Sequence, residues 1–134
     1  MAHQRLQPAG LFPSAQYGFS QVVKARGGNH IFCAGQTAWD RELNIIGEGD
    51  FRAQIRKTLE NVEAALVEAG AGRADVTSLR IFVVDYDLEK LPVIGEELAA
   101  FFGPDSLPAN TLLGIDKLAL PEFMIEIEAF AVTD

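Results

Sequence analysis

Two segments of the chain place large apolar side chains at neighbouring positions, which is the pattern of strands covered on both faces. Within residues 76–84 and 123–132 two apolar sets alternate in each segment: Leu79, Ile81 and Val83 with Phe82 and Val84, then Ile125 and Ile127 with Met124, Phe130 and Val132. Successive side chains of a strand point to opposite faces of the sheet. Burying one such side chain is worth about 1.5 to 3 kcal/mol, so a face left in water would forgo much stabilisation. We therefore expect a sheet with apolar cover on both sides.

Two helical patterns supply cover for one side only. Asp50 is a good N-cap residue, and the apolar residues that follow recur at steps of three and four until Gly70 ends the helix: Phe51, Ile55, Leu59, Val62, Leu66 and Ala69. A second helix is predicted with Pro92 in its first turn and Gly103 at its end, on the spacing of Leu91, Ile94, Leu98 and Phe101.

The remaining β-leaning segments complete the element order. Ser20–Ala25 and His30–Ala34 are separated by the Gly-rich residues 26–29 and are predicted to pair as an antiparallel hairpin. A loop follows, with a short strand expected around Asn44 to Ile46, and Ala109–Asp116 and Phe123–Val132 form the last two strands. The order β-β-α-β-α-β-β predicts an α+β domain with two helices on one face of a mixed sheet.

The second face of that sheet needs another source of cover. We predict that copies of the chain cover it for one another. Closed point-group symmetry is the norm for homo-oligomers, and clefts for ligands would then lie between subunits.

Length and composition limit the class of protein. The 134 residues are expected to form one domain, residues 1–134, with an irregular segment over residues 1–15. With no charged-then-apolar leader and no run of about 18 apolar residues, the chain is expected to be cytoplasmic and not to bind a membrane. A net charge of −8 makes nucleic acid an improbable partner. One cysteine and two histidines favour neither a disulfide framework nor a metal site, and no cofactor motif is present.

Short motifs along nearly the whole chain resemble, in order and spacing, those of the RidA/YjgF family, also called L-PSP endoribonuclease-like proteins. They are Phe19-Ser20-Gln21; Ile31-Phe32-Cys33-Ala34-Gly35-Gln36; Gly49-Asp50-Phe51 with Gln54 and Asn61; Ala69-Gly70 and Asp75-Val76; Phe101-Phe102-Gly103; Pro108-Ala109; and Ile125-Glu126-Ile127-Glu128-Ala129. The resemblance implies a homotrimer of chorismate-mutase-like subunits around a central barrel, with three intersubunit clefts. It also implies cofactor-free hydrolysis of reactive imines and enamines, such as 2-iminobutanoate or 2-iminopropanoate, to a ketoacid and ammonia.

Three positions depart from the family pattern at the expected cleft. Asn110 stands where the family has an arginine that forks onto the substrate carboxylate, Leu112 replaces a cysteine, and Gly95 replaces an asparagine of the second helix. Loss of a charge-assisted hydrogen bond costs about 1.5 to 3 kcal/mol, which weakens the case for a 2-imino acid. The departures favour a different ligand.

Glu126 matches the glutamate that positions the hydrolytic water in the family, and it is the candidate catalytic residue. A carboxylate beside apolar groups can have a raised pKa and activate water; the alternative is a solvated or subunit-bridging acidic face. The substrate-binding candidates are Tyr17, Phe19, Cys33, Gly35, Gln36, Asn110, Thr111 and Leu112. Each has a structural alternative: wall or core packing for the aromatic residues, buried filler for Cys33, close backbone approach for Gly35, and strand-edge hydrogen bonding for Asn110 and Thr111.

These features leave three hypotheses in order. The first is a trimeric imine or enamine hydrolase with an altered substrate preference. The second is a trimer that binds a metabolite or regulates a partner without turnover. The third, an endoribonuclease, lacks paired groups that titrate near neutrality and cations to steady a phosphate.

Overall fold

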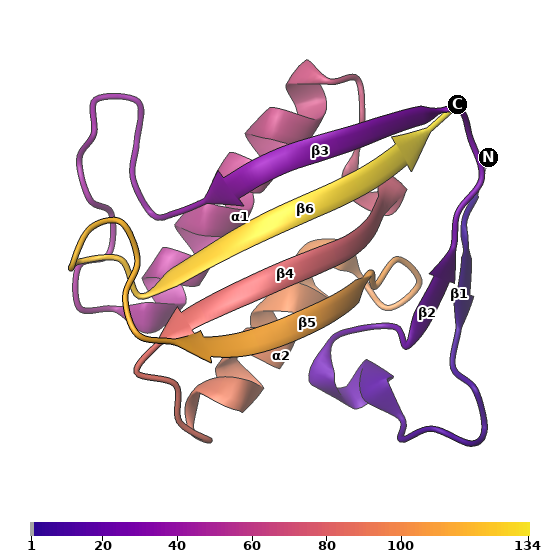
Figure 1. Cartoon of the computed structure of the whole chain (residues 1–134), viewed down its shortest axis with the longest axis horizontal. Coiled ribbons are helices and arrows are strands. Elements are labelled where there is room, and N and C mark those ends of the chain that lie inside the picture. The colour runs from indigo at the N-terminus through magenta and orange to yellow at the C-terminus, as the bar shows by residue number, and fades with distance from the viewer. Residues whose placement is uncertain (1) are drawn as a thin grey trace.

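A four-stranded mixed sheet backed by two helices is the centre of the fold in the computed structural model, which describes residues 2–134. The strand order is β3 (Asn29–Gln36), β6 (Ile125–Thr133), β4 (Val76–Val84) and β5 (Ala109–Ile115). Only the β4 and β5 pair is parallel. The helices α1 (Phe51–Glu68) and α2 (Lys90–Phe102) both lie behind the sheet (Figure 1). The predicted α+β class, mixed sheet and single helical layer are confirmed.

The core forms between the helices and one face of the two inner strands. Ile81 and Val83 of β4 and Ile125 and Ile127 of β6 are fully buried, as are Ile55 and Val62 of α1. The alternating β4 and β6 residues point away from the helices, as period-2 geometry requires. The helix boundaries also follow the sequence: Asp50 accepts a hydrogen bond from the Ala53 backbone N–H, and Gly70 has a φ of +74° just after the helix.

A cluster of charged side chains joins the two helices. Glu97 of α2 is buried, and its carboxylate accepts hydrogen bonds from Arg52 at 2.7 Å and Arg56 at 3.0 Å, both on α1. The hydrogen bond from Arg56 is the main reason that the pKa of Glu97 lies below its usual value. A buried carboxylate is therefore paired rather than neutralised.

The predicted hairpin is wrong. Residues 22–24 form strand β2 (Val22–Lys24), which pairs with β1 (Gln4–Leu6) in a separate two-stranded sheet, while β3 pairs with β6. The link between β2 and β3 does not reverse the chain into a hairpin. Gly27 there has a φ of +125° and lies so close to the Thr133 backbone that a Cβ atom would be 2.4 Å from its oxygen. The glycines that indicated a hairpin turn instead allow the chain to pass the end of β6.

The expectation of an irregular segment over residues 1–15 is also wrong in part, because it contains β1. Arg5 donates hydrogen bonds to the carbonyls of Ala74 at 2.7 Å and Leu107 at 3.0 Å. His3 Nε2 contacts the carbonyl oxygen of Val132 at 3.0 Å. These contacts join residues that are at least 69 positions apart in the sequence, so no local pattern could indicate them. The short helix η1 (Ser14–Tyr17) follows, and a second, η2 (Arg73–Asp75), leads into β4.

The expected short strand around residues 44–46 is reduced to one bridge between Trp39 and Ile45. The Trp39 ring packs edge-on against Phe123, with ring centroids 5.1 Å apart. Trp39 therefore serves loop packing.

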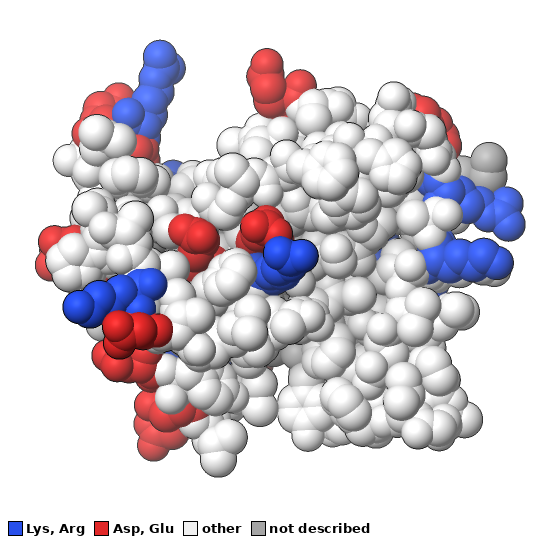
Figure 2. Space-filling model, viewed as in Figure 1, with Lys and Arg blue, Asp and Glu red and all other residues white. Residues whose placement is uncertain are grey.

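The sheet face opposite the helices is open in the single chain (Figure 1). Figure 2 looks onto it and shows a broad uncharged surface with one small group of acidic and basic side chains near its middle. Phe32 on this face is 78% exposed and Leu113 40% exposed. Apolar side chains therefore lie on both faces of the sheet, as the sequence predicts, and the face opposite the helices is uncovered in a single copy.

Candidate functional site

The residues predicted for the site fall into two groups within one chain. Tyr17, Phe19, Asn110 and Leu112 line one cavity between β5 and α2, with a volume of about 130 Å³. Glu126 and Gly35 lie together on the face of the sheet opposite the helices, where β6 meets β3. The strand β4 separates β6 from β5. A single copy therefore does not bring Glu126 to Asn110.

The first group depends on two glycines that bring the backbone of residues 17–18 onto α2. A Cβ atom on Gly18 would lie 2.6 Å from the Gly95 carbonyl oxygen, and one on Gly95 would lie 3.0 Å from that of Tyr17. At Gly18, which also has a φ of +85°, only glycine permits so close an approach, and at Gly95 a Cβ atom would make an unusually tight contact. Gly95, which weakens the helix locally, thus places Tyr17 and its neighbour Phe19 over β5.

The cavity of this group is apolar with one amide in its wall. Ile81, Leu91 and Ile94 complete the lining, and among the described residues none of its lining side chains is a Lys, Arg, His, Asp or Glu. The Asn110 side chain makes no hydrogen bond within residues 2–134. An amide in this position can both donate and accept a hydrogen bond, but it carries no charge for a carboxylate.

The second group is built around Glu126, whose carboxylate lies over the backbone of Gly35. A Cβ atom on Gly35 would be 2.5 Å from Glu126 Oε2. Burial is the main cause of a raised pKa for Glu126, and the charge of Glu128 adds to it. A carboxyl whose pKa is raised holds its proton more readily and is better suited to exchanging it with water.

Three of the predicted binding residues lie away from both groups or on their margins. Cys33 is buried on the helix side of β3, where burial raises the pKa of its thiol, in keeping with the filler alternative. Thr111 is exposed on β5 between the two cavity residues Asn110 and Leu112, so it points to the opposite face. Gln36 donates from its side chain to the Ala34 carbonyl at 3.1 Å, beside the bulge in β3.

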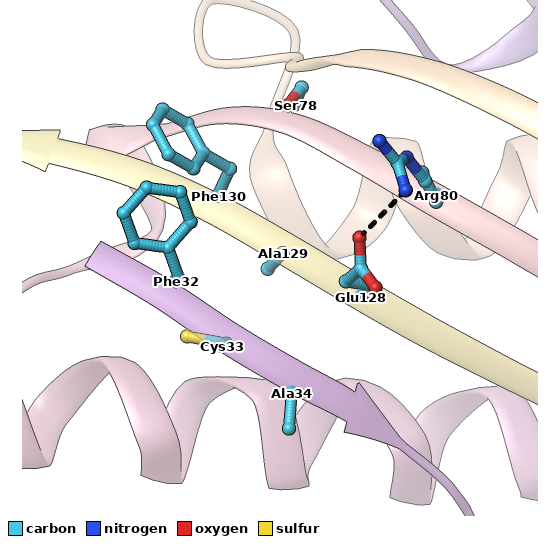
Figure 3. A pocket seen from close by; sticks show the side chains of 8 residues that line it. All are labelled: Phe32, Cys33, Ala34, Ser78, Arg80, Glu128, Ala129 and Phe130. Carbon is cyan, nitrogen blue, oxygen red and sulfur yellow. Dashed lines mark ion pairs between the residues drawn. The ribbon is translucent and has the colours of Figure 1, made fainter. Parts of the chain in front are cut away.

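A second, larger hollow of about 640 Å³ lies on the open face of the sheet (Figure 3). Phe32 and Phe130 stand at one end, with ring centroids 4.6 Å apart, and Arg80 pairs with Glu128 at 3.5 Å at the other. Arg80 was not among the predicted site residues. The alternation of β4 could have found it, because its neighbours Leu79 and Ile81 face the helices and Arg80 must face the other way.

Within residues 2–134 no cluster of three or more His, Cys, Asp or Glu side chains is arranged to hold a metal ion. None of the helices described is long and apolar enough to span a membrane.

Together the fold and the two groups define a small two-layer α+β protein whose candidate site residues lie on both sides of one sheet. The chain belongs to the endoribonuclease L-PSP family, whose model matches residues 11–133. A RutC family protein of Pyrococcus abyssi is 35% identical over 113 residues, which is 84% of each chain. The resemblance to the RidA/YjgF family is confirmed.

Solved structures agree with this assignment. A Rid family protein of unknown function, YyfB from Yersinia pestis, superposes with a TM-score of 0.95 at 37% identity, covering 99% of this chain and 100% of that one. RidA from an Antarctic Psychrobacter superposes with a TM-score of 0.70 at 27% identity, covering 86% of this chain and 88% of its own.

Proposed function

We propose that the chain is a homotrimeric, cytoplasmic hydrolase of the imine or enamine deaminase type, with its clefts between neighbouring copies. The observation that carries this proposal is the carboxylate of Glu126, which lies over Gly35 with a raised pKa. In the reaction, water adds to the carbon of a C=N bond, the bond breaks, and nitrogen leaves as ammonia. Glu126 would take a proton from the attacking water and return one to the nitrogen. Water and one proton-transferring group suffice, so the proposal invokes no cofactor.

The separation of the two residue groups supports a cleft shared by two copies. Asn110 lies on the edge strand β5, and Gly35 lies on the opposite edge strand β3. A cyclic arrangement sets one edge of a copy against the other edge of the next, because a head-to-tail contact joins two different surfaces. The apolar open face would be buried by the same assembly. Each cleft would then hold the Asn110 cavity of one copy and Glu126 of its neighbour.

Ammonia release from freshly generated imines tests the proposed role of Glu126. We expect the parent protein to exceed the uncatalysed rate and Glu126→Gln to lose about 100-fold or more of that excess, since general acid–base catalysis contributes at least this much. Glu68→Gln, which changes an exposed carboxylate at the end of α1, is the matched control and should keep the parent rate. Equal rates for Glu126→Gln and the parent would reject the role.

A non-enzymatic trimer that binds a metabolite is the second candidate. It is favoured by the cavity at Asn110, where Tyr17 is the one titratable residue among the described lining side chains. Thermal unfolding with ketoacids, carboxylates and neutral amides separates the two candidates. A compound that raises Tm and is recovered unchanged, in a protein that releases no ammonia from any imine, would favour binding alone.

A further inference from the structure

The cavity lined by Asn110 adjoins a second apolar space formed by the N-terminal segment. The two share Tyr17, Phe19 and Leu91, and the second, of about 410 Å³, adds Phe12 and Gln16. A ligand-sized space typically measures about 300 to 1,000 Å³. The two adjoining spaces therefore have the amide of Asn110 in the wall of one and the ring of Phe12 in the wall of the other.

Three aromatic rings surround the outer space. Phe12 lies edge-on to Tyr17 and to Phe19, with centroid separations of 6.2 and 6.1 Å. Phe12 remains 57% exposed. Rings that meet edge to face leave apolar surface on which another flat group can pack, and an aromatic pair adds about 0.5 to 1.5 kcal/mol beyond area burial.

The backbone that carries Phe12 is held in place by hydrogen bonds. The Gln21 side chain donates to the Phe12 carbonyl at 3.0 Å. The buried Ser14 hydroxyl donates to the Phe19 carbonyl at 2.7 Å, and Gln7 Nε2 reaches the same oxygen at 3.2 Å. The aromatic wall is thus built before a ligand arrives.

The charges around this space disfavour an anionic ligand. Its described lining residues include no cation. Arg80, on the neighbouring strand, faces the other side of the sheet and is paired with Glu128. A carboxylate beside Asn110 would lose its hydration without gaining a charged partner, which is costly. Gly95 and Leu112 also favour an uncharged ligand. Gly95 lets the backbone of residues 17–18 pack on α2, and Leu112 adds an apolar side chain to the cavity.

We propose that this site takes an uncharged imine or enamine with an aromatic or similarly bulky apolar group, and that Phe12 selects it. This inference rests on the proposed function, whose substrate class it names. The apolar group packs against Phe12, Tyr17 and Phe19, and Asn110 hydrogen-bonds near the C=N group. For an aromatic aldimine, R–CH=NH and water give R–CHO and NH₃. The C=N bond breaks, the oxygen of water becomes the aldehyde oxygen, and both protons of water leave on nitrogen.

Binding of stable probes tests the ligand class without turnover. We expect benzamide to raise the Tm of the parent, and benzoate and acetamide to leave it unchanged. Phe12→Ala should weaken benzamide binding about tenfold in calorimetric titration, which corresponds to about 1.4 kcal/mol. Leu11→Ala, an adjacent exposed apolar residue outside the cavity lining, is the matched control and should bind like the parent.

Asn110→Arg should gain affinity for benzoate. Benzoate binding as tight as benzamide in the parent, or full affinity in Phe12→Ala, would overturn the inference.

A kinetic arm separates this inference from the proposed function. Benzylamine and a flavin-dependent amine oxidase generate benzaldimine, and phenylglycine with an amino-acid oxidase generates the matching imine with a carboxylate. We expect the protein to accelerate ammonia release from the first more than from the second. Benzamide binding that needs Phe12, without acceleration of either imine, would reject the hydrolase and support the ligand class. Acceleration unchanged in Phe12→Ala would support the hydrolase and overturn the ligand class.

Discussion

Three glutamates show how residues of one type acquire different properties from their surroundings. Glu97 is buried between two arginines, and its pKa is lowered chiefly by the hydrogen bond from Arg56. Glu126 has no such partner among the described residues, and burial raises its pKa. Glu128, two positions away on the same face, pairs with Arg80. Of the three, only Glu126 has a raised pKa, the property that the proposed acid–base role calls for.

The raised pKa of Glu126 predicts a pH-dependent effect on stability. The folded state holds the Glu126 proton more tightly than the unfolded chain does, so ionisation above the folded pKa lowers stability. We expect Glu126→Gln to raise the free energy of unfolding at pH 7, and this gain to vanish below about pH 4, near the ordinary pKa of glutamate. Urea unfolding at both pH values measures it. A gain that persists at acid pH would mean that the carboxyl proton is not the cause.

Thr58 offers a second test at this scale. It is fully buried in α1, and its hydroxyl is the one buried side-chain polar atom in residues 2–134 without a hydrogen-bond partner. We expect Thr58→Val to raise the free energy of unfolding by about 1 kcal/mol or more, because the desolvated hydroxyl is removed and the shape is kept. Thr58→Ser, which keeps the hydroxyl and loses a methyl group, should be less stable than the parent. Chemical denaturation of both variants is the measurement.

At the scale of elements, long periodic segments were predictable and short paired ones were not. The steps of three and four from Phe51 onward define α1, and the alternating apolar sets define β4 and β6. β1 has three residues and depends on a partner 18 positions later, together with contacts of His3 and Arg5 to distant carbonyls. The glycines between β2 and β3 fit a hairpin turn equally well. Neither feature is encoded in a local pattern.

The contact between α1 and α2 predicts a dependence on acid. A carboxyl whose folded pKa is lowered contributes stability above its unfolded pKa and loses it as the pH falls through the folded value. We expect Glu97→Ala to lower the free energy of unfolding at pH 7, and the difference from the parent to shrink below about pH 4.3. The effect is modest because Arg52 and Arg56 are partly in solvent. Glu96→Ala, whose carboxylate is exposed, is the control and should change stability less.

At the scale of the whole molecule, the site could be predicted only in part. Matching motifs pointed to Glu126, Gly35 and Asn110, and the structure puts the first two in contact. The place of Phe12 could not be predicted, because it depends on how residues 8–19 fold back over α2 through Gly18 and Gly95. The separation of Glu126 from Asn110 follows from strand order, which propensity does not specify.

The exposed sheet face predicts assembly, and Phe32 is the residue that tests it. Phe32 is 78% exposed on that face. We expect Phe32→Glu to shift the sedimentation of the protein from a trimer toward single copies, because a charge buried in an apolar contact lacks a partner. Val67→Glu, at a 65% exposed position on α1, should leave the assembly intact. A parent protein that sediments as a monomer at micromolar concentration would contradict the proposal of shared clefts.

The position of β6 between β3 and β4 also has a consequence for synthesis. Within the described residues 2–134, β6 is the last strand, yet β3 pairs only with it, and β4 and β5 meet β3 only through it. While the ribosome is still translating the first 124 residues, the two portions of the sheet have no strand to join them. The nascent chain must therefore carry both unpaired edges until residues 125–133 emerge, and this interval is when a holdase chaperone would be most useful to it.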